Sequence, residues 1–332
     1  MAPRTPHPAP VAPSAPSIGV DIGGSKVLAV LLNADGSIEA TARVATPVDG
    51  DAQDVVEAVL AVGARVAGTT DAPSLPLGVG VPGMIDRGGV AHFCPHLHSV
   101  DGVDLHHELA VRRDPGATTV VINDATAACW AEHRAGAGRG FDDLLMVTLG
   151  TGIGGGAILG GRLVEGANGF FGEIGHMVVD PHGPPCPCGK RGCWERFASG
   201  GGLGRLAMEA AQAGRLAGVV ALSGGNPEAV RGEHVTAAAV RGDPGALEVM
   251  NEFAWWLALG LANLANALDP SAIVLGGGLI EVGEVMMGPV RRAFAELAEA
   301  SEARRVSVLP AQLGERAGAV GAALVAAERA AG

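Results

Sequence analysis

Residues 172–195 read GEIGHMVVDPHGPPCPCGKRGCWE and contain three of the chain's five cysteines. Cys186, Cys188 and Cys193 fall within eight positions, and His176 lies ten residues before the first of them. Prolines and glycines between the sulfurs favour tight turns, which can direct three thiolates and one imidazole at one point. That is the ligand set of a closed tetrahedral zinc site. We therefore predict a structural zinc bound by His176, Cys186, Cys188 and Cys193.

Two other interpretations of these cysteines stay open on sequence grounds. Free cysteine is commonly buried, so the thiols could pack in a loop beside a chance histidine, but the loop offers few apolar residues for them. A disulfide would leave an odd thiol, and the N-terminal segment shows no secretion signal. Both interpretations fit the spacing less well than a zinc site.

The composition limits the classes of function. The 332 residues suffice for two domains, and a formal net charge of −12 disfavours sequence-independent binding of nucleic acid. No purely apolar run reaches eighteen residues, so we expect no transmembrane helix and no membrane partner. Residues 1–16 form a Pro/Ala-rich tail without an apolar signal core, and we expect it to be disordered. These features predict a cytoplasmic protein.

Three glycine-rich turns follow predicted strands. Residues 18–32, IGVDIGGSKVLAVLL, predict a hairpin that turns at Gly23-Gly24, and residues 144–160, LLMVTLGTGIGGGAILG, predict a second hairpin. Gly276–Gly278 follows a predicted strand at 272–275. Such loops allow backbone N–H groups to approach a phosphate. A plain type I′ turn at Gly23-Gly24, or ordinary connections elsewhere, stay open, because no loop has P-loop or Rossmann spacing.

Apolar periodicity predicts an alternation of strands and helices along the rest of the chain. Residues 84–102 are expected to be irregular. The predicted strands cover residues 38–45, 77–81, 120–122, 272–275 and 306–309. The predicted helices cover residues 51–67, 103–110, 125–135, 203–213, 235–241, 247–268, 284–300 and 316–330.

Asp124 stands where a predicted strand meets a predicted helix. An aspartate at this position can be the N-cap of the helix. It can also be a carboxylate presented at the edge of a sheet, where open α/β folds bind ligands. The local sequence leaves both roles open.

Taken in order, these motifs resemble those of the ROK-type sugar kinases, and most closely the zinc-containing glucokinases of actinobacteria. The resemblance covers about residues 18–325 and implies an α/β protein with the actin-like ATPase (ribonuclease-H-like) fold, in which two α/β domains flank a cleft. The small domain would comprise residues 17–123 and the C-terminal helix 315–330, and the large domain residues 124–314 with the zinc loop. The matching motifs are Asp21–Lys26, Asn123-Asp124, Leu149–Gly156, Gly172–His176, Cys186–Glu195 and Leu275–Gly278.

The resemblance implies ATP-dependent phosphorylation of glucose at its 6-hydroxyl, with ATP and Mg²⁺ as cofactors. Asp124 would be the general base, because a carboxylate can accept the hydroxyl proton during attack on the γ-phosphate. His176 would bind zinc with one ring nitrogen and the sugar with the other. The implied substrate residues are Gly83, His96, Asn123, Asp124, Glu173, His176 and Glu195. The implied residues for nucleotide and Mg²⁺ are Asp21, Gly23, Gly24, Ser25, Lys26, Thr151, Gly152, Gly154, Gly276, Gly277 and Gly278.

Two positions depart from the family's pattern. Many members have Asn where this chain has His96, and the second Asn of Asn-Asp-Ala-Asn is here Thr126. The first departure makes another hexose, such as mannose, fructose or an N-acetylated amino sugar, the main alternative substrate. Polyphosphate as donor is a further alternative, as is a sugar-responsive repressor, although about seventeen residues before Ile18 leave too little chain for a winged helix. We also expect a homo-oligomer, either a dimer or a tetramer.

Overall fold

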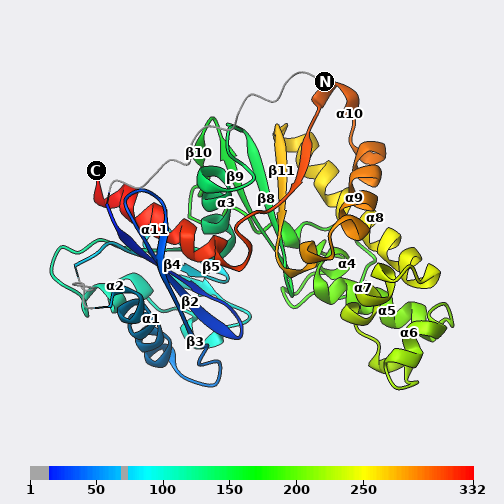
Figure 1. Ribbon diagram of the computed structural model, residues 1–332, viewed down its shortest axis with the longest axis horizontal. Helices are drawn as coiled ribbons and strands as arrows, with labels where there is room; N and C mark the ends of the chain where they lie inside the picture. Colours follow the sequence, from blue (N-terminus) through cyan, green and yellow to red (C-terminus); the bar gives the residue numbers. More distant parts are fainter. Residues whose placement is uncertain (1–14, 69–73) are drawn as a thin grey trace. The chain divides into compact units, whose positions relative to one another are not determined.

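The computed structural model describes residues 15–68 and 74–332 (Figure 1). Apart from Ala15 and Pro16, the tail predicted to be disordered lies outside the described residues. The chain divides into two compact units. The first comprises Met1–Met146, Gly156–Gly172 and Gln312–Gly332, and the second comprises Val147–Gly155 and Glu173–Ala311. The predicted division into a small domain of residues 17–123 and 315–330 and a large domain of residues 124–314 stays a prediction.

The first unit is built from short strands and four helices among its described residues. Its helices are α1 (Ala52–Ala67), α2 (Leu105–Ala110), α3 (Asp124–Ala135) and α11 (Ala317–Ala330), with 3₁₀ turns η1 (His98–Val100) and η5 (Gly314–Arg316). Its strands are β1 (Ser17–Ile22), β2 (Lys26–Leu32), β3 (Ile38–Ala45), β4 (Leu77–Val81), β5 (Met84–Ile85), β6 (Ala91–Phe93), β7 (Thr119–Asn123) and β10 (Arg162–Leu163).

The second unit is mainly helical. Its helices are α4 (Glu195–Ala198), α5 (Gly200–Gln212), α6 (Ala217–Leu222), α7 (Gly232–Val240), α8 (Pro244–Leu268), α9 (Glu284–Leu297) and α10 (Ser301–Arg304). Its 3₁₀ turns are η2 (Ile174–His176), η3 (Pro227–Ala229) and η4 (Gly278–Val282), and its strands are β11 (Ala272–Gly276) and β12 (Ser307–Pro310). Strands β8 (Leu144–Leu149) and β9 (Ile153–Leu159) complete a second sheet of order β10-β9-β8-β11-β12.

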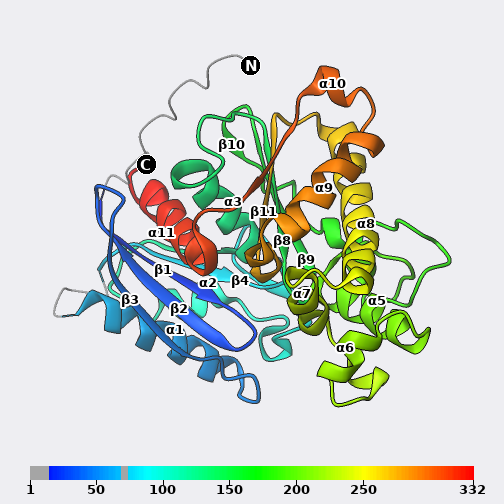
Figure 2. The same ribbon diagram turned by 45° about the vertical axis from the view of Figure 1, so that its right-hand side comes forward.

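The first sheet has the strand order β3-β2-β1-β4-β7, and Figure 2 labels β3, β2, β1 and β4. Strand β1 is antiparallel to β2 and parallel to β4, and β4 is parallel to β7. Successive residues of a strand face opposite sides of the sheet. Ile18 accordingly faces Gly63 of α1, and its neighbour Gly19 faces α11. The apolar band of α1 thus covers one face, and the largely buried helix α11 covers the other.

Glycines in β1 and β4 allow α11 to lie directly on the sheet. A Cβ on Gly19 would lie 1.9 Å from the carbonyl oxygen of Ala319, and a Cβ on Gly78 would lie 1.9 Å from that of Ala322. Real Cβ atoms do not approach that closely, so larger residues would push the helix away. The high content of glycine and alanine therefore has a packing role in this unit.

Most of the predicted elements are confirmed, with small differences at their ends. Helix α1 buries Val55, Val59, Val62 and Val66, the band expected from the periodicity. Residues 84–102, expected to be irregular, in fact contain the small hairpin of β5 and β6 and the turn η1. That expectation was wrong because strands of two or three residues are too short to show a period of two.

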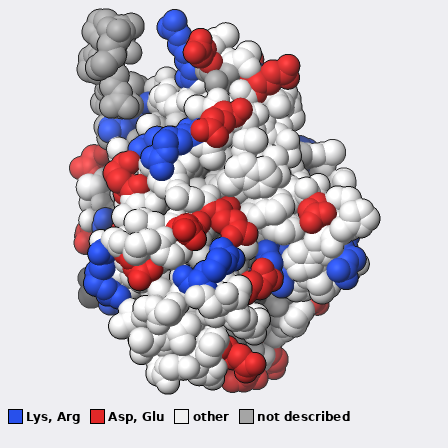
Figure 3. Space-filling view, turned by 90° about the vertical axis from the view of Figure 1, so that its right-hand side faces the viewer, with Lys and Arg blue, Asp and Glu red and all other residues white. Residues whose placement is uncertain are grey.

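The charged surface and the helices bear on the kind of partner. On the face seen in Figure 3, the described Lys and Arg side chains are interspersed with Asp and Glu and form no continuous basic patch. Among the described residues, no helix is both long enough and apolar enough to span a bilayer.

Candidate active site

The carboxyl ends of three parallel strands bring the polar residues of the first unit together. In the register of the sheet, Asp21 of β1 pairs with Gly80 of β4, and Val81 pairs with Asn123 of β7. Parallel strands end at the same edge, which is where open α/β sheets bind ligands. A Cβ on Gly80 would lie 3.3 Å from Asp21 Oδ1 and 3.5 Å from Asp124 Cα. Asp21 and Asp124 therefore converge on this edge.

Asn123, and not Asp124, is the N-cap of helix α3. Its Oδ1 accepts a hydrogen bond from the backbone N of Thr126 at 2.9 Å, and its Nδ2 donates to the carbonyl oxygen of Gly83 at 3.0 Å. Asp124 is the first helical residue, and its Oδ1 accepts from the N–H of Ala125 at 2.8 Å. The interpretation of Asp124 as the N-cap is therefore wrong, because the preceding asparagine fills that position.

Asp21 is a carboxylate in an unfavourable environment. Its Oδ1 is excluded from solvent and accepts no hydrogen bond from the described residues. Burial, together with the negative charge of Asp124, raises the pKa of Asp21 to about 8, against an opposing effect of Lys26. A buried oxygen without a donor fits a residue that faces a cation, because Mg²⁺ prefers oxygen ligands.

The turn between β1 and β2 differs from the type I′ alternative. Neither Gly23 nor Gly24 has the positive φ that such a turn requires. Instead Gly23 N donates to Lys26 O at 2.9 Å, and Thr46 Oγ1 donates to Gly23 O at 2.6 Å. Ser25 O accepts from the N–H of Thr46 at 3.2 Å. The turn is therefore held from the end of β3.

Two further predicted residues of the first unit, Lys26 and His96, have these surroundings. The ammonium group of Lys26 pairs with the carboxylate of Glu315 in η5. His96 is exposed, in a turn closed by a hydrogen bond of 2.8 Å from Leu97 N to Cys94 O. Their roles toward nucleotide and sugar stay predictions.

In the second unit, the glycine loop between β8 and β9 lies against the start of α5 and against the glycines that end β11. Gly150 N donates to Gly152 O at 3.1 Å, and Gly200 N donates to Gly150 O at 2.8 Å. Thr151 is exposed at the tip of the loop, and Gly154 is half-buried in β9. Gly277 has φ +91°, and a Cβ there would lie 2.3 Å from the carbonyl oxygen of Leu149. Two glycine loops predicted to hold the nucleotide thus meet at the ends of β8 and β11.

A cavity of about 740 Å³ opens beside these loops, within the second unit. Its walls come from the start of α5, from residues 230–236 and from η4, and they include Leu203, Arg205 and Gly278. Its volume lies in the range of small-molecule and cofactor sites. The glycines of its wall, which include Gly200 and Gly201, leave flat backbone that a planar ring can approach.

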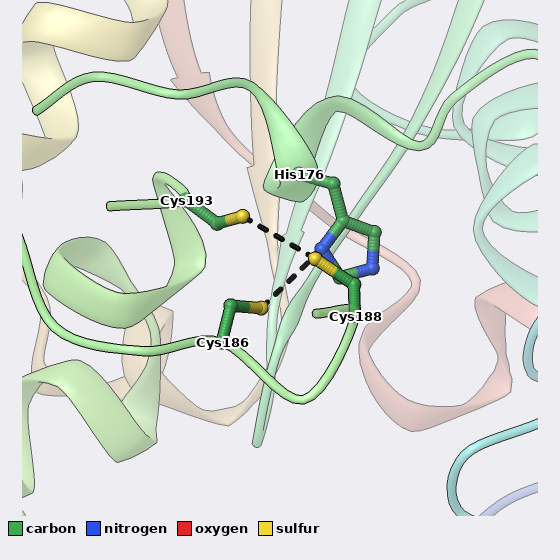
Figure 4. A group of neighbouring side chains, drawn as sticks. All are labelled: His176, Cys186, Cys188 and Cys193. Carbon is green, nitrogen blue, oxygen red and sulfur yellow. Dashed lines mark hydrogen bonds between the residues drawn. The ribbon is translucent and has the colours of Figure 1, made fainter. Parts of the chain in front are cut away.

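The predicted metal ligands converge on one point of the second unit (Figure 4). The ligand atoms of His176, Cys186, Cys188 and Cys193 all lie within 4.8 Å of one another. His176 Nδ1 is 3.7 Å from Cys186 Sγ, and the sulfurs of Cys188 and Cys193 are 3.5 Å apart. Two sulfurs at tetrahedral positions 2.3 Å from zinc would be about 3.8 Å apart. The cluster is therefore close to the size of a zinc site, and its cysteines form no disulfide.

Tight turns bring the sulfurs together. Gly189 N donates to Cys186 O at 3.0 Å, and Cys186 N donates to Lys190 O at 2.8 Å, so the chain reverses around Cys188. Gly192 has φ +68°, and a Cβ there would lie 1.5 Å from the carbonyl oxygen of Asp180. Only glycine fits that position, and it leads directly into Cys193.

Two carboxylates lie on either side of the His176 ring. Nδ1 faces the cysteines and is 3.5 Å from Glu195 Oε1, whereas Nε2 is 3.8 Å from Glu173 Oε2. Burial raises the pKa of Glu173, an effect opposed by His176 and reinforced by Glu195. With Nδ1 among the sulfurs, Nε2 is the nitrogen left to face a substrate, which fits the double role implied by the resemblance.

Two residues that join elements of the first unit were missed by sequence analysis. Glu132 is fully buried, and its Oε1 accepts from Gln312 N at 2.9 Å and from Leu313 N at 2.8 Å. It thereby joins α3 to the segment that leads to Glu315. A glutamate within an apolar helix was the signal available for Glu132, whereas nothing local indicates Glu315.

Comparison with known proteins places the chain in one family. The model of the ROK family matches residues 17–329. A glucokinase of Streptomyces coelicolor is 39% identical over 318 residues, which cover 94% of this chain and 98% of that protein. A glucokinase of Thermotoga maritima is 36% identical over 313 residues, which cover 94% and 97%.

A solved structure gives the same result. The ROK family glucokinase of Streptomyces griseus, in complex with glucose and AMPPNP, superposes with a TM-score of 0.82 at 39% identity. The match covers 95% of this chain and all of that one. The expectation of the actin-like ATPase fold is confirmed by this similarity and by the mixed α/β sheets. The chain belongs to the ROK family.

Proposed function

We propose that the protein transfers the γ-phosphoryl group of ATP to the 6-hydroxyl of glucose, with Asp124 as general base. The observation that carries the proposal is the position of Asp124 beside Asp21 at the carboxyl edge of the first sheet, with Asn123 as the cap of α3. The Asp124 carboxylate is therefore not required as a cap. Relatives that are 36–39% identical over most of the chain are glucokinases, which supports this choice of reaction.

The proton transfer follows from the chemistry of the hydroxyl. A sugar hydroxyl is a weak nucleophile, and a carboxylate within hydrogen-bond reach accepts its proton as the oxygen attacks phosphorus. Such a base contributes about 10²–10⁴ to the rate. The larger part of phosphoryl transfer depends on in-line positioning and on neutralising the charge of the phosphates.

The nucleotide would occupy the cavity of about 740 Å³, next to Gly278. Apolar residues such as Leu203 and Leu279 would contact the base, and the backbone of Gly276–Gly278 would follow the adenosine. Thr151, Gly152 and Gly154, with Gly23, Gly24, Ser25 and Lys26, would provide donors to the phosphates. Asp21, with its unpartnered buried oxygen, would hold Mg²⁺, which supplies charge neutralisation on the β- and γ-phosphates when bound.

The sugar would contact Gly83, His96, Asn123, Glu173, His176 and Glu195. Zinc at the four-residue cluster would keep His176 and the Cys193–Glu195 segment in place. Four protein ligands leave no open coordination position, so that metal would have a structural role. The predicted dimer or tetramer and the cytoplasmic location stay predictions.

The test is a coupled assay of the purified protein with ATP and six sugars: glucose, mannose, fructose, galactose, N-acetylglucosamine and N-acetylmannosamine. We expect kcat/KM to be highest for glucose and the product to be glucose 6-phosphate. Polyphosphate in place of ATP tests the alternative donor. A higher kcat/KM for another hexose would correct the substrate, and no transfer to any sugar would contradict the proposal.

A further inference from the structure

Gly152 and Glu195 lie against each other in the second unit. A Cβ built on Gly152 would lie 2.8 Å from Glu195 Oε2. That distance is shorter than real side chains adopt, so the missing side chain at position 152 leaves the room that the carboxylate fills. The φ of Gly152 is not positive, so its backbone conformation does not itself require glycine.

The other oxygen of the same carboxylate faces the metal cluster. Glu195 Oε1 is 3.1 Å from Cys186 Sγ and 3.5 Å from His176 Nδ1. The side chain is only 17% exposed. The carboxylate is therefore confined between the cysteine loop on one side and the β8–β9 loop on the other.

The β8–β9 loop is in turn hydrogen-bonded to a segment that lines the cavity. The Gly150 carbonyl accepts from Gly200 N at 2.8 Å, and Gly200 is the first residue of α5. Both Gly200 and Gly201 line the cavity of about 740 Å³. The loop that confines Glu195 is thus hydrogen-bonded to the backbone that borders the cavity.

We propose that Gly152 is a positioning residue for the sugar site: the β8–β9 loop holds the Glu195 carboxylate in its sugar-binding orientation. The inference rests on the proposed function, because it takes a hexose to be the ligand of Glu195. A methyl group at position 152 displaces the carboxylate without straining the loop. Because linked equilibria are reciprocal, a sugar bound to Glu195 also favours one conformation of this loop.

The test compares two alanine variants in the same loop. Gly152→Ala places a methyl group against Glu195, whereas a Cβ at Gly150 meets nothing within 4 Å and its φ is likewise not positive. Forcing a side chain off its rotamer predicts a roughly five- to tenfold weaker glucose Kd for Gly152→Ala. We expect Gly150→Ala to stay within about twofold of the wild type. Both affinities are measured by titration calorimetry without nucleotide, and both variants should keep the wild-type zinc content.

A double-mutant cycle shows whether the effect acts through Glu195. Glu195→Asp shortens the side chain and withdraws the carboxylate from position 152. In that background we expect Gly152→Ala to weaken glucose binding by less than about twofold, because the close contact no longer exists.

The outcomes separate this inference from the proposed function. Equal weakening in Gly150→Ala and Gly152→Ala, or the same loss in the Glu195→Asp background, would overturn the role of Gly152 while the kinase stands. A wild-type protein that binds none of the six sugars would overturn the proposed function, and the inference with it.

Discussion

The side chain of Asn123 caps helix α3 through Thr126, with 2.9 Å between Asn123 Oδ1 and Thr126 N. The same side chain donates to the carbonyl oxygen of Gly83, which follows β4. One residue therefore fixes both the start of α3 and the loop beside it. Asp124 follows directly as the first residue of α3, so the cap at Asn123 also fixes the backbone from which the Asp124 side chain extends.

Replacing the capping residue should cost stability. Asn123→Ala removes an acceptor for the first turn of α3, and we expect the free energy of unfolding to fall by about 1–2 kcal/mol. Urea denaturation measures this change. The matched control is Asn123→Asp, which keeps the acceptor oxygen and should lose less. Equal stability of the alanine variant and the wild type would show that the cap is not important.

The metal site predicts one zinc per chain in protein purified without added zinc. Cys188→Ala removes one of four ligands, so we expect loss of zinc and of glucose binding together. Cys129 is buried outside the cluster, and Cys129→Ala is the control that should keep the metal. Metal analysis and glucose calorimetry are the measurements. Full glucose affinity in zinc-free protein would contradict the structural role of the metal.

The raised pKa of Asp21 predicts a pH-dependent stability. The folded protein keeps the proton up to a pKa of about 8, whereas the unfolded chain releases it near the ordinary value of 3.8. The folded state therefore binds more protons between these values, and the free energy of unfolding must fall as pH rises from about 4 to about 8. Above about pH 8 Asp21 is ionised in both the folded and the unfolded state, so its contribution to the free energy of unfolding no longer changes with pH. At about 1.4 kcal/mol per pKa unit, the contribution is about 6 kcal/mol at most.

Asp21→Asn removes that titration. Without nucleotide or Mg²⁺, we expect the variant to be more stable than the wild type at pH 8 and to approach it toward pH 4. Its kinase activity should be strongly reduced, because the residue proposed to hold Mg²⁺ is lost. Thermal unfolding at several pH values is the measurement, and parallel curves for the two proteins would contradict a buried, protonated Asp21.

The elements that were predicted correctly have strong local patterns. The hairpin of β1 and β2 and the valine band of α1 each depend on residues close together in sequence. The metal ligands were predictable for the same reason, because four side chains fall within 18 positions. Short-range periodicity and spacing carry this information directly.

The contacts that were not predicted join distant segments. Lys26 pairs with Glu315 across 289 positions, and Glu132 accepts from Gln312 across 180. The local sequence does not indicate which of these distant residues meet, because their contacts depend on how α11 packs against β1 and α3. The capping role of Asn123 was missed for another reason: Asn and Asp are equally good caps, and the boundary of the helix decides between neighbours.

The most direct test of the account is the kcat of Asp124→Asn with glucose and ATP. Asparagine has nearly the same volume and cannot accept the hydroxyl proton, and the cap of α3 is Asn123, so folding should be preserved. We expect kcat to fall by roughly two to four decades, with the glucose Kd within a modest factor and thermal stability unchanged. A variant that phosphorylates glucose at nearly the wild-type rate would contradict Asp124 as the general base.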